Sequence, residues 1–115
     1  MLEIRVEPVS RDEVVVSACG ELDWATSGEL RAAITALLNR GGTVAIGLDL
    51  SAVGFIDSIG IGTLVAAQRI CQQVGVRLRL TAASAFASRL LHVTGIDEAL
   101  GIPASAAEAT LATTR

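Results

Sequence analysis

The chain contains no lysine, one histidine and two cysteines among its 115 residues, and each shortage excludes a class of chemistry. A phosphate-binding loop of the nucleoside-triphosphatase type requires a lysine and cannot be built. A serine nucleophile needs a base, and the only histidine, His92, falls on or just after a helix other than the one that carries the candidate serine. Cys19 and Cys71 match neither a redox motif nor a metal-ligand spacing. We therefore expect no metal site, no cofactor and no enzymatic activity.

Charged residues are few, and acidic ones predominate. Nine basic and twelve acidic residues give a net charge of −3, and no basic patch stands out, so we do not expect nucleic acid as a partner. The longest uncharged run, residues 58–68, is too short and too rich in glycine to span a bilayer. The first residues lack the basic and apolar regions of a signal peptide.

These absences together predict the cellular setting of the chain. We expect a cytoplasmic protein without direct membrane insertion. In a reducing compartment Cys19 and Cys71 should be reduced thiols, and we expect both to be buried. A regulatory disulfide between them is the alternative.

The apolar residues predict strands that alternate with helices. Alternation with a period of two predicts strands over residues 2–6, 14–18 and 76–81, and the short link between the first two indicates a hairpin. The continuous apolar run over residues 44–50 is typical of a central strand buried on both faces. This order of elements predicts one α/β domain over residues 1–115 with a mixed sheet that carries helices.

Helix boundaries follow from capping residues and glycines. The first helix begins at Asp23 or at Thr26, which forms a capping-box pattern with Glu29, and it ends at residues 41–42. The second runs over residues 58–74 and ends at Gly75. A third follows Ser84 and ends at residue 95. Residues 96–102 are expected to be a short connection, either irregular throughout or with a brief edge strand. Residues 105–108 form a second capping-box pattern that begins a last alanine-rich helix.

The helix predicted over residues 58–74 has two different faces. Ile61 and Val65 fall among polar residues, on the same side as Ser58. Two β-branched residues on a polar face that also carries Ser58 indicate a contact surface; a covering loop or ordinary exposure is the alternative. The residues expected to pack on the sheet are Ile59, Ala66, Ala67, Ile70, Cys71 and Val74, with Leu64 at the margin.

Asp57 and Ser58 lie between a predicted strand and a predicted helix, in the segment Gly-Phe-Ile-Asp-Ser-Ile-Gly-Ile-Gly over residues 54–62. At a helix start, backbone N–H groups are unpaired and the dipole is positive, so a phosphate on Ser58 would be stabilised there. Simple helix capping by either residue is the other explanation. Ile56 replaces the first glycine of a nucleophile elbow, and Val65 replaces the third glycine of a dinucleotide-binding motif.

Two motifs, Gly20-Glu21-Leu22-Asp23 and residues 53–64, resemble those of STAS domains, and more narrowly those of the stand-alone anti-sigma factor antagonists of bacteria. The resemblance implies a mixed sheet of four to five strands with helices packed mainly on one face. It also implies partner switching. In that family the unphosphorylated antagonist binds an anti-sigma factor that is also a serine kinase, which frees the sigma factor. The kinase then phosphorylates the antagonist with ATP and breaks the complex, and a serine phosphatase restores it.

By this resemblance Ser58 matches the phosphorylated serine, Asp57 its acidic neighbour, and Asp23 the acid of the Gly-Glu-Leu-Asp loop near the same surface. Ile59 departs from the frequent Asp-Ser-Ser-Gly pattern and removes an alternative hydroxyl. The alternative function is a non-catalytic STAS subunit of a lipid transporter or of a stressosome-type assembly. The oligomeric state stays open, and pairing of the opening strand at a sheet edge is one route to association. The partner surface expected from these arguments comprises Asp23, Asp57, Ser58, Ile61, Gly62, Val65 and Arg69.

Overall fold

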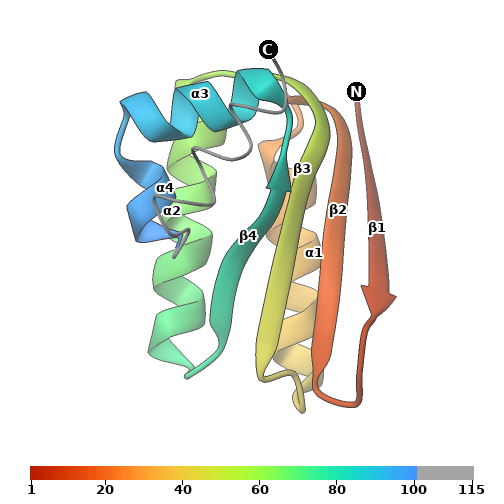
Figure 1. Cartoon of the computed structure of the whole chain (residues 1–115). Helices are drawn as coiled ribbons and strands as arrows, with labels where there is room; N and C mark the ends of the chain where they lie inside the picture. Colours follow the sequence, from red (N-terminus) through yellow and green to blue (C-terminus); the bar gives the residue numbers. More distant parts are fainter. Residues whose placement is uncertain (101–115) are drawn as a thin grey trace.

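The computed structural model describes residues 1–100, which form a four-stranded sheet with helices on one of its faces (Figure 1). The sheet order is β1-β2-β3-β4, in which β1 is antiparallel to β2 while β2, β3 and β4 are parallel. This arrangement confirms the predicted α/β class, the mixed sheet and the opening hairpin. The elements are β1 (Leu2–Pro8), β2 (Glu13–Leu22), α1 (Ser27–Arg40), β3 (Ala45–Ile56), α2 (Ser58–Gln73), β4 (Arg77–Ala83), α3 (Ala85–Val93) and α4 (Ile96–Ala99).

The central strand β3 is buried on one face only. Ile46, Leu48 and Leu50 are buried, whereas the alternate residues Gly47 and Asp49 are only half-buried. The prediction of a strand buried on both faces was wrong, because the helices cover a single side of the sheet and leave the other side open to solvent. A strand in such a sheet needs apolar side chains only at every second position.

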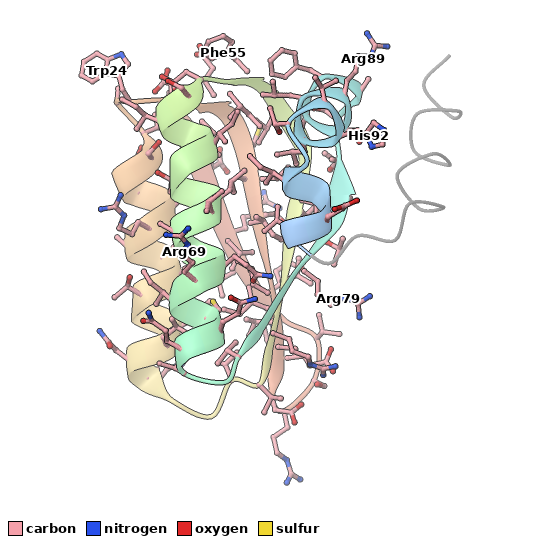
Figure 2. The ribbon with its side chains drawn as sticks, turned by 90° about the vertical axis from the view of Figure 1, so that its left-hand side faces the viewer. Trp24, Phe55, Arg69, Arg79, Arg89 and His92 are labelled. Atoms are coloured by element: carbon pink, nitrogen blue, oxygen red, sulfur yellow. The ribbon has the colours of Figure 1, made fainter. Side chains whose placement is uncertain are left out.

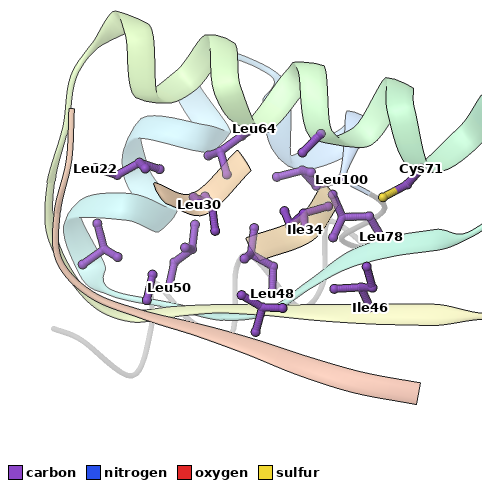
Figure 3. Packing of buried hydrophobic residues seen from close by; sticks show 14 of the residues in the cluster. Leu22, Leu30, Ile34, Ile46, Leu48, Leu50, Leu64, Cys71, Leu78 and Leu100 are labelled. Carbon is purple, nitrogen blue, oxygen red and sulfur yellow. The ribbon is translucent and has the colours of Figure 1, made fainter. Parts of the chain in front are cut away.

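The core fills the space between the sheet and the helices (Figure 3). Leucines from different elements meet there, among them Leu22, Leu30, Leu48 and Leu64, all fully buried. Burial of each such side chain contributes about 1.5–3 kcal/mol. Aliphatic residues, more than aromatic ones, therefore hold α1 and α2 against the sheet.

Helix α2 packs on the sheet with a face that only partly matches the predicted one, because Leu64, Ala67 and Cys71 are buried as expected while three other residues of that set are not. Ile59, Ile70 and Val74 are exposed, and the first of these keeps 52% of its surface accessible. Gly60 determines this orientation, because a Cβ atom there would lie only 2.3 Å from the carbonyl oxygen of Leu22. A glycine brings the backbones together without adding to the hydrophobic period, so the pattern of apolar residues could not reveal it. The buried residues of α2 are Gly60, Thr63, Leu64, Ala67 and Cys71.

The start of α1 also differs in detail from the prediction. Thr26 is the N-cap residue, but its side chain does not cap the helix. Its hydroxyl instead donates to the backbone oxygen of Glu21 at 2.7 Å and accepts from the N–H of Asp23 at 3.0 Å. The capping box with Glu29 is therefore wrong, since the threonine hydroxyl is used to fold the preceding loop.

The chain that follows α3 also differs from the prediction. The short helix α4 replaces the predicted connection with its edge strand, and Gly95 precedes it with a φ of 76°. The predicted helix that starts at residue 105 lies outside the described residues. Among residues 1–100, no helix is both long and apolar enough to cross a bilayer.

The two cysteines lie on opposite sides of the sheet and are both free thiols. Cys71 is fully buried on α2, as predicted, and this burial raises the pKa of its thiol. Cys19 is exposed, so the prediction of a buried thiol was wrong at this position. The reason is the alternation of β2, in which Ala18 points into the core and Cys19 to the open face.

We predict that a thiol reagent distinguishes the two cysteines. At pH 8 iodoacetamide should label Cys19 quickly and leave Cys71 unmodified, because the raised pKa and the burial of Cys71 keep it protonated and inaccessible. Intact-mass measurement should show a single adduct, and a second one only in guanidinium chloride. Equal labelling of both thiols in the folded protein would contradict the packing of α2.

Candidate functional site

Ser58 is the first residue of α2, and its side chain is exposed. The preceding residue, Asp57, has an extended backbone and is the N-cap. Its Oδ1 atom accepts a hydrogen bond from the N–H of Gly60 at 2.8 Å. Of the two residues that could have capped the helix, Asp57 therefore takes that role. The hydroxyl of Ser58 is left at the surface beside the positive end of the helix.

The second carboxylate oxygen of Asp57 reaches the loop between β2 and α1. Its Oδ2 atom accepts from the N–H of Trp24 at 3.0 Å, and the N–H of Asp57 donates to the oxygen of Leu22 at 3.2 Å. The two sequence motifs, 33 residues apart at this contact, are thus joined directly. One carboxylate fixes both the start of α2 and the neighbouring loop.

Asp23 is half-buried and organises its own loop. Its Oδ1 atom accepts from the N–H of Ala25 at 3.0 Å and lies 3.2 Å from the hydroxyl oxygen of Thr26, whose hydrogen is donated to Glu21. The predicted proximity to the Ser58 surface holds, because its neighbour Trp24 is bonded to Asp57. The contacts of Asp23 indicate that it shapes the surface from within.

Four of the predicted site residues follow one stripe of α2, because their spacing of four, three and four places them on the same side of the helix. Ser58, Gly62 and Arg69 are exposed and Val65 is partly buried. Ile61 differs from them, since it is partly buried and packs against the hydrophobic core. Its place on a polar face therefore reflects packing as well as exposure.

Three exposed apolar side chains that the sequence analysis did not assign to the site lie at the same end of the molecule. Trp24 and Phe55 keep 75% and 44% of their surfaces accessible, and Figure 2 shows both beside the start of α2. Ile59, expected in the core, is the residue after Ser58 and is also exposed. The ring of Phe55 stacks on Phe86 of α3 with centroids 6.2 Å apart. Clustered exposed apolar groups are typical of protein-binding surfaces.

A sequence signal for two of these residues did exist. Trp24 is the only tryptophan of the chain and directly follows the Gly-Glu-Leu-Asp motif, in a polar loop where no core position was predicted. Phe55 lies within the second motif, two residues before Asp57. A large aromatic residue in a polar segment next to a candidate site is itself a reason to include it.

The described residues contain no group of three or more histidine, cysteine, aspartate or glutamate side chains placed to hold a metal ion. What the site does present is an exposed hydroxyl, a helix dipole and apolar side chains. Such a surface can bind another protein and can sense a change of charge.

Comparison with known proteins places the chain in a family. The family model described as "Mlab, STAS domain" matches residues 7–103. The chain belongs to the STAS domain family. Among curated relatives, the anti-sigma F factor antagonist of Lysinibacillus sphaericus is 28% identical over 95 residues, which cover 83% of this chain and 81% of that protein.

Solved structures agree with this assignment. An anti-sigma factor antagonist from Mycobacterium paratuberculosis is 27% identical and superimposes with a TM-score of 0.77 over 96% of this chain and 94% of its own. The anti-sigma factor antagonist SpoIIAA in its unphosphorylated form is 26% identical, with a TM-score of 0.72 over 84% of each chain. The STAS fold expected from the two motifs is therefore confirmed.

We predict opposite effects for alanine at two glycines of α2. Gly60→Ala should destabilise the protein by about 1–3 kcal/mol, since its Cβ would collide with the Leu22 carbonyl. Gly62→Ala is the matched control, because nothing lies within 4 Å of a Cβ there, and alanine should stabilise the helix by about 0.5–1 kcal/mol. Urea denaturation monitored by circular dichroism measures both. Equal stability of the two variants would mean that α2 does not rest on β2 at Gly60.

Proposed function

We propose that this STAS protein is an anti-sigma factor antagonist controlled by phosphorylation of Ser58. Unphosphorylated, it binds in the cytoplasm to an anti-sigma factor that is also a serine kinase, and the sigma factor is freed. Phosphorylation ends that complex, and a serine phosphatase restores it. The observation that carries the proposal is the exposed Ser58 at the start of α2, next to an exposed apolar surface. The names of the relatives support the same role.

Asp57 caps α2 and Ser58 does not, which favours a regulatory role for Ser58 over simple helix capping. Asp57 already accepts from the Gly60 N–H, so the cap does not require the hydroxyl of Ser58. An exposed serine that the fold does not use is available to a kinase. The alternative, a non-catalytic subunit of a lipid transporter or a stressosome-type assembly, requires the same fold but no modification of this serine.

The proposed partner surface has a rim and an apolar centre. Trp24, Phe55 and Ile59 supply large exposed apolar groups close to Ser58. Tryptophan is enriched among residues that dominate binding energy at interfaces. Gly62, Val65 and Arg69 extend the surface along α2, while Asp23, Asp57 and Ile61 support it from inside.

The switch needs no change of fold. Phosphorylation adds a charge of about −1.5 to −2 at pH 7. In the free protein the helix dipole stabilises the added phosphate by about 0.3–1 kcal/mol. The nearby carboxylate of Asp57 repels the phosphate and so acts in the opposite direction. Inside a complex the same charge is buried against the partner, and an unpaired buried charge costs several kcal/mol. A loss of about 4 kcal/mol lowers affinity about a thousandfold.

We predict that a negative charge at position 58 strongly weakens binding of the anti-sigma factor and that removal of the hydroxyl does not. Ser58→Asp should bind a kinase-type anti-sigma factor of the source organism at least about a hundredfold more weakly than the unmodified protein, which is about 2.7 kcal/mol. Ser58→Ala should bind normally and gain no phosphate during incubation with that kinase and ATP. Calorimetry measures the affinities and intact mass the phosphorylation.

Thr35→Asp is the control for the Ser58 variants, because it adds the same charge at an exposed position on α1 and should leave affinity unchanged. Binding of Ser58→Asp equal to that of the unmodified protein would contradict the switch. Co-purification with a membrane permease and its ATPase, without phosphorylation of Ser58, would support the transporter subunit instead.

We predict that Trp24 anchors the partner. Trp24→Ala should weaken binding about 30-fold or more, corresponding to about 2 kcal/mol, and should leave the unfolding midpoint unchanged because the side chain is mostly exposed. Val9→Ala removes an exposed apolar side chain from the β1–β2 turn and serves as the control. If both variants bind normally, the aromatic end is not part of the interface.

A further inference from the structure

Strand β1 forms one edge of the sheet, and within residues 1–100 it pairs only with β2 (Figure 1). Two hydrogen bonds define the phase of this hairpin: Glu21 N–H donates to Met1 O at 3.1 Å, and Val9 N–H donates to Glu13 O at 2.9 Å. Antiparallel pairs alternate between bonded and non-bonded positions. The register of the hairpin is unbroken from Leu2 to Pro8. Alternation from either hydrogen bond therefore gives the same result for the direction in which the backbone groups of each β1 residue point.

The result is that odd-numbered residues of β1 use their backbone groups within the hairpin. The N–H and C=O groups of Leu2, Ile4 and Val6 point away from β2, to the outer side of the edge. Such a row of unpaired groups is a template for another strand. The side chains of Glu3 and Arg5 are exposed on the open face of the same strand, with Arg5 Nε 3.9 Å from Glu3 Oε1.

We propose that this edge binds the β1 strand of a second copy of the chain, antiparallel, with Ile4 opposite the partner's Ile4. The two four-stranded sheets then join into one continuous sheet with both helical layers on the same side. This inference concerns a different part of the molecule and does not rest on the proposed function.

The charges of β1 select this register over its neighbours. With Ile4 at the centre, Glu3 lies opposite the partner's Arg5, at non-hydrogen-bonded positions where side chains approach most closely. A shift by two residues one way brings Arg5 opposite the partner's Arg5, and a shift the other way brings Glu3 opposite the partner's Glu3. A shift by one residue puts apolar side chains opposite polar ones. The register centred on Val6 also pairs opposite charges, Arg5 with the partner's Glu7, but it places Pro8, which has no N–H, at a hydrogen-bonding position opposite the partner's Ile4.

The outward hydrogen bonds fit the same register. Leu2, Ile4 and Val6 then face the partner's Val6, Ile4 and Leu2, so every outward N–H and C=O of this stretch has a partner. Pro8 has no N–H to offer, and it lies just beyond the paired residues, where none is required.

Two further observations favour β1 as the edge that associates. Val6 is 42% exposed although it lies on the helix-covered side of the sheet, where Leu2 is buried, and the partner's Leu2 would cover it. The other edge strand, β4, carries Arg77 and Arg79 on its open side. Two charges of one sign give self-pairing of β4 no complementary contact.

Sedimentation velocity over a concentration series tests the proposal, with a monomer–dimer equilibrium as the expected result. Val6→Pro should weaken the dimer at least about tenfold, because it removes an outward N–H that the hairpin does not use. Hydrogen exchange gives a second readout. The amide hydrogens of Ile4 and Val6 should exchange more slowly as the protein concentration rises, whereas that of Arg5 should exchange slowly at every concentration. A monomer at every concentration up to about 1 mM, the upper range of specific dissociation constants, would overturn the proposal.

A charge exchange tests the register and does not depend on the folding of the proline variant. Glu3→Arg and Arg5→Glu should each be monomeric alone, because each puts like charges opposite one another. Mixed together they should form a heterodimer, since every cross-strand charge pair is then complementary, and native mass spectrometry distinguishes it. Arg79→Glu, on the other edge, is the control and should dimerise normally. Dimers of both single variants as stable as the parent dimer, or assembly that grows beyond a dimer, would contradict this pairing.

Discussion

The arrangement around Ser58 in this STAS protein depends on two hydrogen bonds that the carboxylate of Asp57 accepts. One oxygen receives the N–H of Gly60 and the other the N–H of Trp24. A hydrogen bond to a charged acceptor contributes about 1.5–3 kcal/mol, so this one side chain connects the start of α2 to the loop before α1. The position of the tryptophan relative to Ser58 follows from that connection.

The same contact separates structural from regulatory chemistry. Because Asp57 satisfies the helix end, the hydroxyl of Ser58 is not needed by the fold. Gly60 completes the arrangement, since only a residue without a Cβ lets α2 approach the Leu22 carbonyl so closely. A charged group added at Ser58 would then change the surface while the core beneath it, from Leu22 to Leu64, stays as it is (Figure 3).

A sheet covered on one side determines the remaining surfaces. In β2 and in the first half of β3, residues alternate between the core and the open face, so Cys19 is exposed and Asp49 half-buried while Ala18 and Leu48 are buried. In β1 this alternation coincides with the phase of the hairpin ladder. Its charged side chains therefore lie on the open face, while the backbone groups of the residues between them point away from β2. A strand that pairs with this edge therefore meets both charged side chains and unpaired backbone groups.

The sequence by itself determined the order of elements up to α3, the helix ends at Gly41, Gly75 and Gly95, and the place of Asp57 and Ser58 between strand and helix. These features depend on neighbouring residues: capping groups, glycine at positive φ and the period of apolar residues. The α/β class followed from that order, and the number of strands fell within the range that the motif resemblance implied.

Only the tertiary structure decided that α2 packs through Gly60, that Asp57 and not Ser58 caps it, and that Trp24 and Phe55 are exposed at the end of the molecule where α2 begins. Each of these depends on contacts between segments far apart in the chain, such as Gly60 against Leu22 and Asp57 with Trp24. A hydrophobic period records how apolar side chains repeat within one element. It contains no information on a glycine that packs through its backbone or on a carboxylate with a partner in another loop.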